Sequence, residues 1–122
     1  MIKKEKKSHN SWCYANLEEV KKNMQTTSFS DEKLIYVKGK VEDTIPEKMP
    51  DKISLLRLDT DWYESTKHEL THLYPKVCKS GVLIIDDYGT WAGSKRAVDE
   101  YFQDSPILLN RIDSGNRLAV KT

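Results

Sequence analysis

The chain has 122 residues, of which 20 are lysine or arginine and 19 are aspartate or glutamate, giving a formal net charge of +1. This length fits one folded domain, expected over residues 16–122 after an irregular segment over residues 1–15. The balanced charge lacks the positive excess that phosphate neutralisation requires, so we expect no nucleic-acid partner. No apolar run approaches the about 20 residues of a membrane-spanning helix, so no membrane association is expected.

The cysteine content and the N-terminus bear on the cellular compartment. Two cysteines, Cys13 and Cys78, are too few for a disulfide framework. The basic N-terminus is not followed by the apolar segment that a secretory signal contains. We therefore expect a reduced protein of the cytoplasm.

Local patterns predict three elements in the first half of the chain. Asn16 is placed to cap a helix whose apolar positions recur at helical spacing. The apolar segment 34–37 contains β-branched residues and ends near a glycine, which favours a strand. Residues 41–48 are expected to form a short helical turn that Pro46 interrupts.

The next segments predict a strand, a helix and a second strand. Segment 53–58 is apolar and ends at Asp59, which favours a strand. A helix is expected over about 64–78, with Gly81 just after its end. The four aliphatic residues 82–85 predict the following strand.

The remaining segments complete an α/β fold. Ser94 can cap a further helix, and residues 107–112 and 117–121 flank a Gly-containing turn that predicts an antiparallel hairpin. Strands and helices that alternate along the chain imply a parallel sheet covered by helices. The hairpin adds antiparallel strands, so we expect an α/β fold with a mixed sheet.

Acidic residues follow two of the predicted strands, Asp59 and Asp61 after one, and Asp86 and Asp87 after the other. Ligands gather at the carboxyl ends of parallel strands, so these carboxylates are expected to converge if the strands are neighbours. Crowded carboxylates repel one another, and Mg²⁺, which prefers oxygen ligands, relieves that repulsion. Aspartate at a strand-to-helix turn is also a common helix cap, so ligation and capping stand as alternatives.

Two tryptophans, Trp62 and Trp91, follow the same strand ends in the sequence. Large aromatic side chains most often pack in a protein core. Their position after the strands equally suits the wall of a pocket for a flat ligand. Both interpretations stand at this point.

Residues 68–72 read H-E-L-T-H, the zinc-peptidase pattern in which two histidines bind zinc and the glutamate acts as base. On a helical projection His68 and His72 fall opposite the apolar face that contains Leu70, so they are expected to face water. A zinc peptidase needs them in a cleft beside a third ligand, for which His9 and Glu100 are the candidates. We therefore interpret both histidines as surface residues and keep a zinc peptidase as the least favoured function.

Two segments carry a family resemblance: residues 55–66, LLRLDTDWYEST, and residues 81–89, GVLIIDDYG. Together with L-Y-P-K at residues 73–76, they resemble the macrocin O-methyltransferase (TylF-type) family. Its members use S-adenosylmethionine and Mg²⁺ to methylate sugar hydroxyls of natural products. The resemblance runs from about Asn16 to the C-terminus. It implies a Rossmann-like class I methyltransferase sheet, mostly parallel with a C-terminal antiparallel hairpin.

The resemblance also implies roles for particular residues. By position, Asp59, Asp86 and Asp87 would be the Mg²⁺ ligands, and Asp59 would help to remove the proton of the acceptor hydroxyl. Val41 and Glu42 lie in a segment similar to one that borders the adenine in the distantly similar catechol O-methyltransferases. With Asp59, they are therefore implied as cofactor neighbours. The catalytic lysine of those enzymes has no equivalent after Asp59.

The chain departs from the family at its N-terminal side. The family's glycine-rich turn and the acid-bearing strand that binds the ribose are not found in the 122 residues. The resemblance thus covers the C-terminal part of a truncated family sheet, whose bare edges can pair with other strands. Either the sheet rearranges, a partner chain such as a second copy fills the gap, or the chain is a degenerate copy.

The expected function is an S-adenosylmethionine- and Mg²⁺-dependent O-methyltransferase that acts on a hydroxyl of a small molecule. Whether this chain is active without the glycine-rich part is left open by the sequence. The alternative from another class is a non-catalytic α/β remnant that self-associates through its sheet edges.

Overall fold

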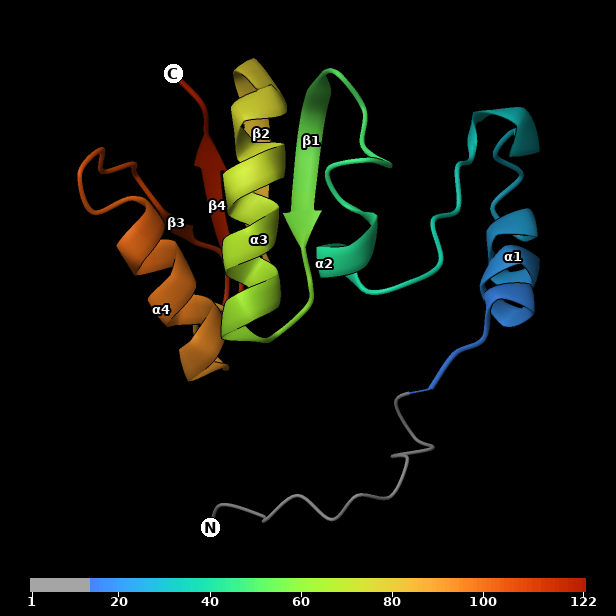
Figure 1. The fold of residues 1–122 in the computed structure, drawn as a ribbon, viewed down its shortest axis with the longest axis horizontal. Coiled ribbons are helices and arrows are strands. Elements are labelled where there is room, and N and C mark those ends of the chain that lie inside the picture. The colour runs from blue at the N-terminus through green and yellow to red at the C-terminus, as the bar shows by residue number, and fades with distance from the viewer. Residues whose placement is uncertain (1–13) are drawn as a thin grey trace, which may run out of the picture. The chain divides into compact units, whose positions relative to one another are not determined.

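The computed structural model describes residues 14–122, which fall into two compact units, one that ends at Lys38 and one that spans Gly39–Thr122. In the first unit, helix α1 spans Leu17–Gln25 (Figure 1). Its cap is the predicted one, because the Glu19 backbone N–H donates a 2.8 Å hydrogen bond to the Asn16 side chain. A single 3-10 turn, Asp31–Lys33, follows.

The strand predicted over residues 34–37 is wrong. These residues are not part of any strand, and no strand within residues 14–122 pairs with them. Ile35 is 88% exposed, so its apolar side chain has no core to enter. A strand is stabilised by hydrogen bonds to a neighbouring strand, and a local apolar pattern does not supply one.

The second unit is an α/β layer, as predicted. Its sheet has the strand order β1-β2-β4-β3, in which β1 pairs parallel with β2, and β4 pairs antiparallel with both β2 and β3. The predicted C-terminal hairpin is therefore present and makes the sheet mixed. The elements are α2 (Val41–Thr44), β1 (Ile53–Leu58), α3 (Tyr63–Leu73), β2 (Val77–Ile85), α4 (Ala92–Tyr101), β3 (Asn110–Arg111) and β4 (Arg117–Val120).

The helix predicted to reach Cys78 ends earlier. Helix α3 stops at Leu73, a 3-10 turn that contains Pro75 follows, and β2 already begins at Val77. Proline cannot donate the backbone hydrogen bond that would continue the helix. Gly81 therefore lies inside β2, where a Cβ atom would come within 2.8 Å of the Cys78 carbonyl oxygen. Its role is close backbone packing, and the predicted helix-end role is wrong.

Helix α4 also starts differently from the prediction. It begins at Ala92, with Trp91 in the cap position, so Ser94 lies inside the first turn. Ser94 is only 3% exposed. A small side chain is needed there because that part of the helix is packed inside the fold.

The core lies between one face of the sheet and helices α3 and α4. Alternate residues of the paired strands, such as the register partners Leu56, Leu83 and Ala119, are buried on that face. Figure 1 shows α3 in front of β2, with β1 beside it. The buried apolar cluster comprises Ile53, Leu56, Leu58, Leu70, Leu73, Val77, Leu83, Ile85, Val98, Phe102 and Ala119.

The other face of the sheet carries apolar side chains that are open to solvent within the described residues. Leu55 is 58% exposed and Val120 is 50% exposed, and both are register partners of Val82 on β2. β1 is an edge strand of this sheet. One face of the sheet is thus buried, and the opposite face is only partly covered.

Within residues 14–122, the structure contains no helix that combines the length and the apolar character needed to cross a membrane.

Candidate functional site

The parallel pairing of β1 with β2 determines where the acidic residues meet. Leu58 is the register partner of Ile85, and the Asp86 N–H donates a 2.9 Å hydrogen bond to the Leu58 carbonyl. The two strands therefore end at the same level. As a result, Asp59, Asp86 and Asp87 each present a carboxylate oxygen within 4.8 Å of the others. The structure brings all three predicted metal ligands together.

Arg57 supplies a positive charge beside this cluster. Its Nη2 atom lies 2.5 Å from Asp86 Oδ1 and 3.2 Å from Asp59 Oδ2. The hydrogen bond from Arg57 lowers the pKa of the Asp86 carboxyl. One guanidinium thus offsets part of the charge of three carboxylates.

The negative charges of the other two carboxyl groups, Asp59 and Asp87, are poorly offset by positive charge. Partial burial, followed by the Asp86 carboxylate, raises the pKa of Asp59. A hydrogen bond with the Asp61 carboxylate raises the pKa of Asp87 to about 7, with burial as a further cause. Crowded oxygen donors with too little positive charge around them fit a hard divalent cation such as Mg²⁺.

Asp61 reaches Asp87 from a tight turn after β1. The Trp62 N–H donates a 2.7 Å hydrogen bond to the Thr60 carbonyl, which closes a turn of three residues centred on Asp61. Asp61 has a φ of 65°, a left-handed conformation that costs an L-residue about 1–2 kcal/mol. This tight, left-handed turn places a fourth carboxylate beside Asp87.

The start of α3 is tied to the same turn by a buried glutamate. The Thr60 hydroxyl donates a 3.0 Å hydrogen bond to Glu69 Oε2. Glu69 is only 5% exposed, and this burial raises its pKa to about 7. Ser65, also buried, donates from its hydroxyl to the carbonyls of Thr60 and Trp62. The turn that carries Asp59 and Asp61 is therefore fixed to the first two turns of α3.

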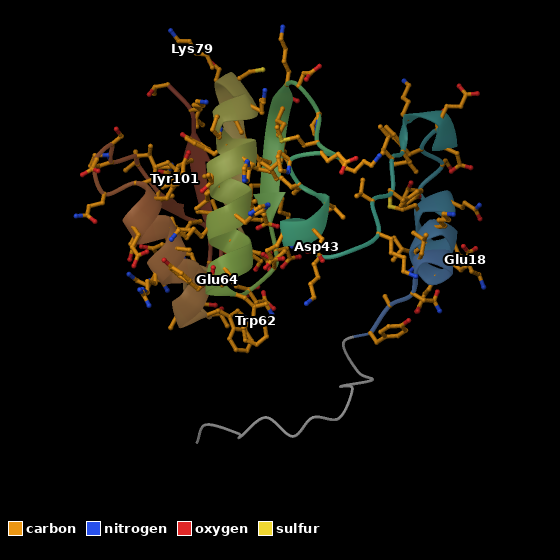
Figure 2. The ribbon with its side chains drawn as sticks, in the orientation of Figure 1. Glu18, Asp43, Trp62, Glu64, Lys79 and Tyr101 are labelled. Carbon is orange, nitrogen blue, oxygen red and sulfur yellow. The ribbon has the colours of Figure 1, made fainter. Side chains whose placement is uncertain are left out.

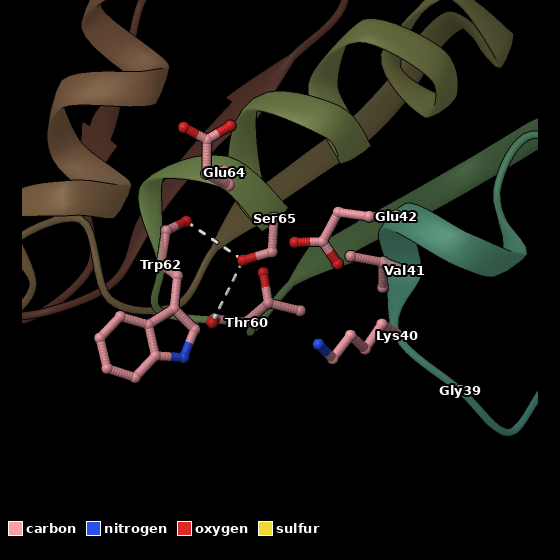
Figure 3. A pocket seen from close by; sticks show the side chains of 8 residues that line it. All are labelled: Gly39, Lys40, Val41, Glu42, Thr60, Trp62, Glu64 and Ser65. Atoms are coloured by element: carbon pink, nitrogen blue, oxygen red, sulfur yellow. Dashed lines mark hydrogen bonds between the residues drawn. The ribbon is translucent and has the colours of Figure 1, made fainter.

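A cleft of about 540 Å³ lies beside this turn (Figure 3). Val41 and Glu42, the predicted cofactor neighbours, line one side of it from the start of α2. Thr60, the residue after Asp59, lines the other side. The full lining is Gly39, Lys40, Val41, Glu42, Thr60, Trp62, Glu64 and Ser65. Val41 and Glu42 thus face the segment that follows Asp59.

The two tryptophans that follow the strands are exposed. Trp62 is 63% exposed and Trp91 is 47% exposed, so core packing is excluded as their role. Their ring centroids are 6.3 Å apart, with an angle of 33° between the ring planes. Figure 2 shows Trp62 at the N-terminal end of α3, near Glu64.

Comparison with known proteins identifies the family. The family model of the macrocin O-methyltransferases (TylF) matches residues 2–116. The chain belongs to the macrocin O-methyltransferase family. The fold and the acidic strand ends agree with the resemblance seen in the motifs of residues 55–66 and 81–89.

Individual relatives support the same assignment. The chain is 42% identical over 92 residues to the demethyldecarbamoylnovobiocin O-methyltransferase of Streptomyces niveus, an alignment that covers 75% of this chain and 35% of that protein. It is 34% identical over 93 residues to the 8-demethyl-8-(2,3-dimethoxy-alpha-L-rhamnosyl)-tetracenomycin-C 4'-O-methyltransferase of Streptomyces olivaceus, covering 76% of this chain and 35% of that one.

A solved structure confirms the fold. The O-methyltransferase NovP superposes with a TM-score of 0.82 at 39% sequence identity, covering 87% of this chain and 45% of NovP. The chain thus spans about a third of the length of the curated relatives it matches and less than half of NovP. The Rossmann-like α/β class is confirmed, although only the β1–β2 pairing of this macrocin-methyltransferase sheet is parallel.

The H-E-L-T-H motif does not form a three-ligand site in the described residues. The rings of His68 and His72 are in contact, tilted by 55° with centroids 4.5 Å apart, and His68 Nε2 lies 2.7 Å from the Ile45 carbonyl oxygen. Glu69 is buried against Thr60. Within residues 14–122, the three aspartates are the only group of three ligating side chains close enough to share an ion. His9, the remaining candidate ligand, lies outside the described residues.

The histidines are less exposed than predicted. Both His68 and His72 are half-buried. The helical projection correctly places both histidines on the side of α3 that faces away from Leu70. That side is not open to water, because α2 and the following Ile45 pack against it. Their position is explained by this packing.

Two residues of this site have other roles than the sequence predicts: Arg57 was not a predicted site residue, and Glu69 was considered only as the base of the zinc-peptidase motif. Arg57 stands two residues before Asp59 on the same strand, so a cation beside the acids was visible in the sequence. Glu69 lies nine residues after Thr60, and only the fold of α3 brings the two together. Glu69 directly precedes Leu70 and lies three residues after Thr66, both of which are buried. This position on the helix was a weak signal that Glu69 also faces inward.

Proposed function

We propose that this chain forms the metal-binding and acceptor side of an O-methyltransferase site. The reaction is transfer of a methyl group from S-adenosylmethionine to a hydroxyl of a sugar or similar small molecule, with Mg²⁺ as cofactor. The observation that carries this proposal is the convergence of Asp59, Asp86 and Asp87 within 4.8 Å at the ends of two parallel strands.

The three carboxylates would hold the metal in this proposal. Their oxygens are ligands of the kind Mg²⁺ prefers, and a divalent ion would offset the charge that Arg57 leaves uncompensated. Bound S-adenosylmethionine supplies the methyl group, and bound Mg²⁺ orients the acceptor and lowers the pKa of its hydroxyl. Asp59, half-exposed at the end of β1, is the residue proposed to accept the hydroxyl proton.

In the proposed methyl transfer, the acceptor hydroxyl would give its proton to the Asp59 carboxylate, and its oxygen would form a bond to the methyl carbon. The bond between that carbon and the sulfur of S-adenosylmethionine would break, and the sulfur would keep the electron pair. The protein's contribution is to align the oxygen with the methyl group.

Val41 and Glu42 are proposed to lie beside the adenosine part of the cofactor. They support this role because they line the cleft whose opposite wall is Thr60, next to Asp59. A ligand in this cleft would therefore extend toward the carboxylates. We place the reaction in the cytoplasm, with a small molecule rather than a nucleic acid as partner.

A ligand titration of the 122-residue chain tests the proposal. We expect Mg²⁺ and S-adenosylmethionine together to raise the melting temperature, and Asp86→Asn to lose this response. Asp51→Asn is the matched control, because Asp51 is an exposed aspartate before β1. A response to Mg²⁺ alone would support the carboxylate site without a cofactor site. No response of the unmodified chain to Mg²⁺ would contradict the proposal.

The exposed sheet face favours a second candidate function. Leu55 and Val120 are at least half-exposed on the face opposite α3 and α4, and β1 is an edge strand of the sheet. Such surfaces tend to pair with another chain. The alternative is therefore a non-catalytic protein that self-associates through this sheet. It predicts association without any response to Mg²⁺ or to S-adenosylmethionine.

A further inference from the structure

Trp62 and Trp91 occupy equivalent positions in the fold. Trp62 is the N-cap residue of α3, and Trp91 is the N-cap residue of α4. Helices favour serine, threonine, aspartate or asparagine there, because their side-chain oxygens accept hydrogen bonds from the first backbone N–H groups. The indole nitrogen of tryptophan is a donor only and cannot do so. Both helices therefore lack the side-chain hydrogen bond of a normal N-cap and have a tryptophan in its place.

Burial does not explain this choice, because both indoles are exposed, by 63% and 47%. Their contact is with each other, at 6.3 Å between ring centroids. Gly93 makes this contact achievable, because a Cβ atom at that position would lie 2.9 Å from the Tyr63 backbone nitrogen. Glycine therefore lets the first turn of α4 approach the first turn of α3, which brings the two cap residues together.

Both tryptophans are linked through the backbone to the segments that carry the acidic residues, and Trp62 also lines the cleft that Val41 and Glu42 share with Thr60. Trp62 follows Asp61, whose carboxylate lies beside that of Asp87. The Trp91 N–H donates a 2.9 Å hydrogen bond to the Asp87 carbonyl. Trp62 is thus the next residue after one aspartate of this region, and the backbone of Trp91 is hydrogen bonded to that of another. In Figure 3 the Trp62 indole extends away from Ser65.

We propose that Trp62 and Trp91 form a stacking platform that binds the sugar ring of the acceptor beside the carboxylates. This inference rests on the proposed methyltransferase function. A pyranose ring has an apolar face of C–H groups and an edge of hydroxyls. Aromatic rings bind the C–H face because of their electron-rich π surface. The hydroxyl edge can then point to Asp59, Asp86 and Asp87.

Saturation-transfer NMR with methyl α-L-rhamnopyranoside at millimolar concentration tests the platform on the full chain. We expect transfer to the ring C–H protons of the sugar in the unmodified protein. Trp62→Ser and Trp91→Ser should each reduce it severalfold, whereas Trp62→Phe should retain much of it. Leu108→Ser is the matched control, because Leu108 is an apolar residue that is 77% exposed and lies between α4 and β3.

Melting temperatures separate a binding role from a structural one. Because serine can cap a helix, Trp62→Ser and Trp91→Ser should melt at the same temperature as the unmodified chain or higher. A clear decrease would show that the pair supports the fold, and would overturn the proposal. Equal saturation transfer in the serine variants, or none in the unmodified protein, would also overturn it.

The Mg²⁺ response distinguishes this inference from the function on which it rests. Serine variants that keep the Mg²⁺-induced increase in melting temperature and lose the sugar signal support the platform. If the unmodified chain shows no Mg²⁺ response, the proposed function fails. If it shows that response and the tryptophan substitutions leave sugar binding intact, only the platform fails.

Discussion

Arg57 contacts two of the three carboxylates that we propose as Mg²⁺ ligands, Asp86 at 2.5 Å and Asp59 at 3.2 Å. A guanidinium and a metal ion compete for the same oxygens. We therefore expect Arg57→Ala to bind Mg²⁺ more tightly, on the order of tenfold, which corresponds to about 1.4 kcal/mol. Isothermal titration at about pH 8 would measure this.

The control for this prediction is Arg96→Ala, which removes an arginine on α4 that pairs with Glu100. Its Mg²⁺ affinity should equal that of the unmodified chain. Weaker Mg²⁺ binding in Arg57→Ala would contradict the prediction. It would indicate instead that the arginine holds the carboxylates in the arrangement that binds the metal.

At the residue scale, the sequence predicted which acids would meet, because the ends of neighbouring parallel strands lie at one edge of the sheet. It could not predict that Asp61 adopts a φ of 65° and reaches Asp87. It also left open whether Trp62 and Trp91 are buried. Apolar composition predicts burial, and here the close approach allowed by Gly93 places the two rings together at the surface.

At the scale of the element, helix α3 contains a buried acid whose charge opposes folding. Burial raises the pKa of Glu69 from 4.5 to about 7. The folded protein therefore holds this proton more tightly than the unfolded chain. The contribution of protonated Glu69 to the free energy of unfolding is fully present below about pH 4.5. It is lost as the pH rises through about 7 and the buried carboxyl becomes charged.

Glu69→Gln removes this titration and can still accept the hydrogen bond of Thr60. We expect the variant to be more stable than the unmodified chain at pH 8, by up to about 3 kcal/mol. The advantage should shrink as the pH falls from about 8 to about 5. Urea unfolding across this range measures it, with the exposed Glu47→Gln as control. A difference in stability that does not change with pH would contradict the prediction.

Element boundaries were less predictable than element types. Segments 53–58 and 82–85 were identified as strands because aliphatic runs of that length are typical of buried strands. Segment 34–37 has a similar pattern but pairs with no strand of the described residues 14–122, since pairing depends on a strand distant in sequence. The apolar spacing continues past Pro75 and so predicts helix as far as Cys78, whereas the chain changes from helix to strand at this proline.

At the scale of the whole molecule, the sequence predicted an α/β sheet but not which of its faces is covered. The register places Leu55, Val82 and Val120 side by side on one face of neighbouring strands. Their neighbours Leu56, Leu83 and Ala119 are buried on the other face. Alternation tells which residues share a face, and only the positions of α3 and α4 determine which face is buried.

The exposed face of this sheet predicts self-association of the isolated chain. Leu55 on β1 and Val120 on β4 lie in one row, on either side of their register partner Val82 on β2, and both are at least half-exposed, so a second copy can bury them. Complete burial of such a side chain contributes about 1.5–3 kcal/mol. Leu55→Lys should therefore weaken association about tenfold or more, because a charge would be buried in the contact.

Sedimentation velocity over a range of protein concentrations measures this association. The matched control is Leu108→Lys, which adds the same charge at an exposed leucine outside the sheet face and should associate like the unmodified chain. If all three proteins are monomers at every concentration, the face does not mediate self-association and the remnant hypothesis loses its support. If both lysine variants dissociate equally, net charge rather than the apolar face controls association.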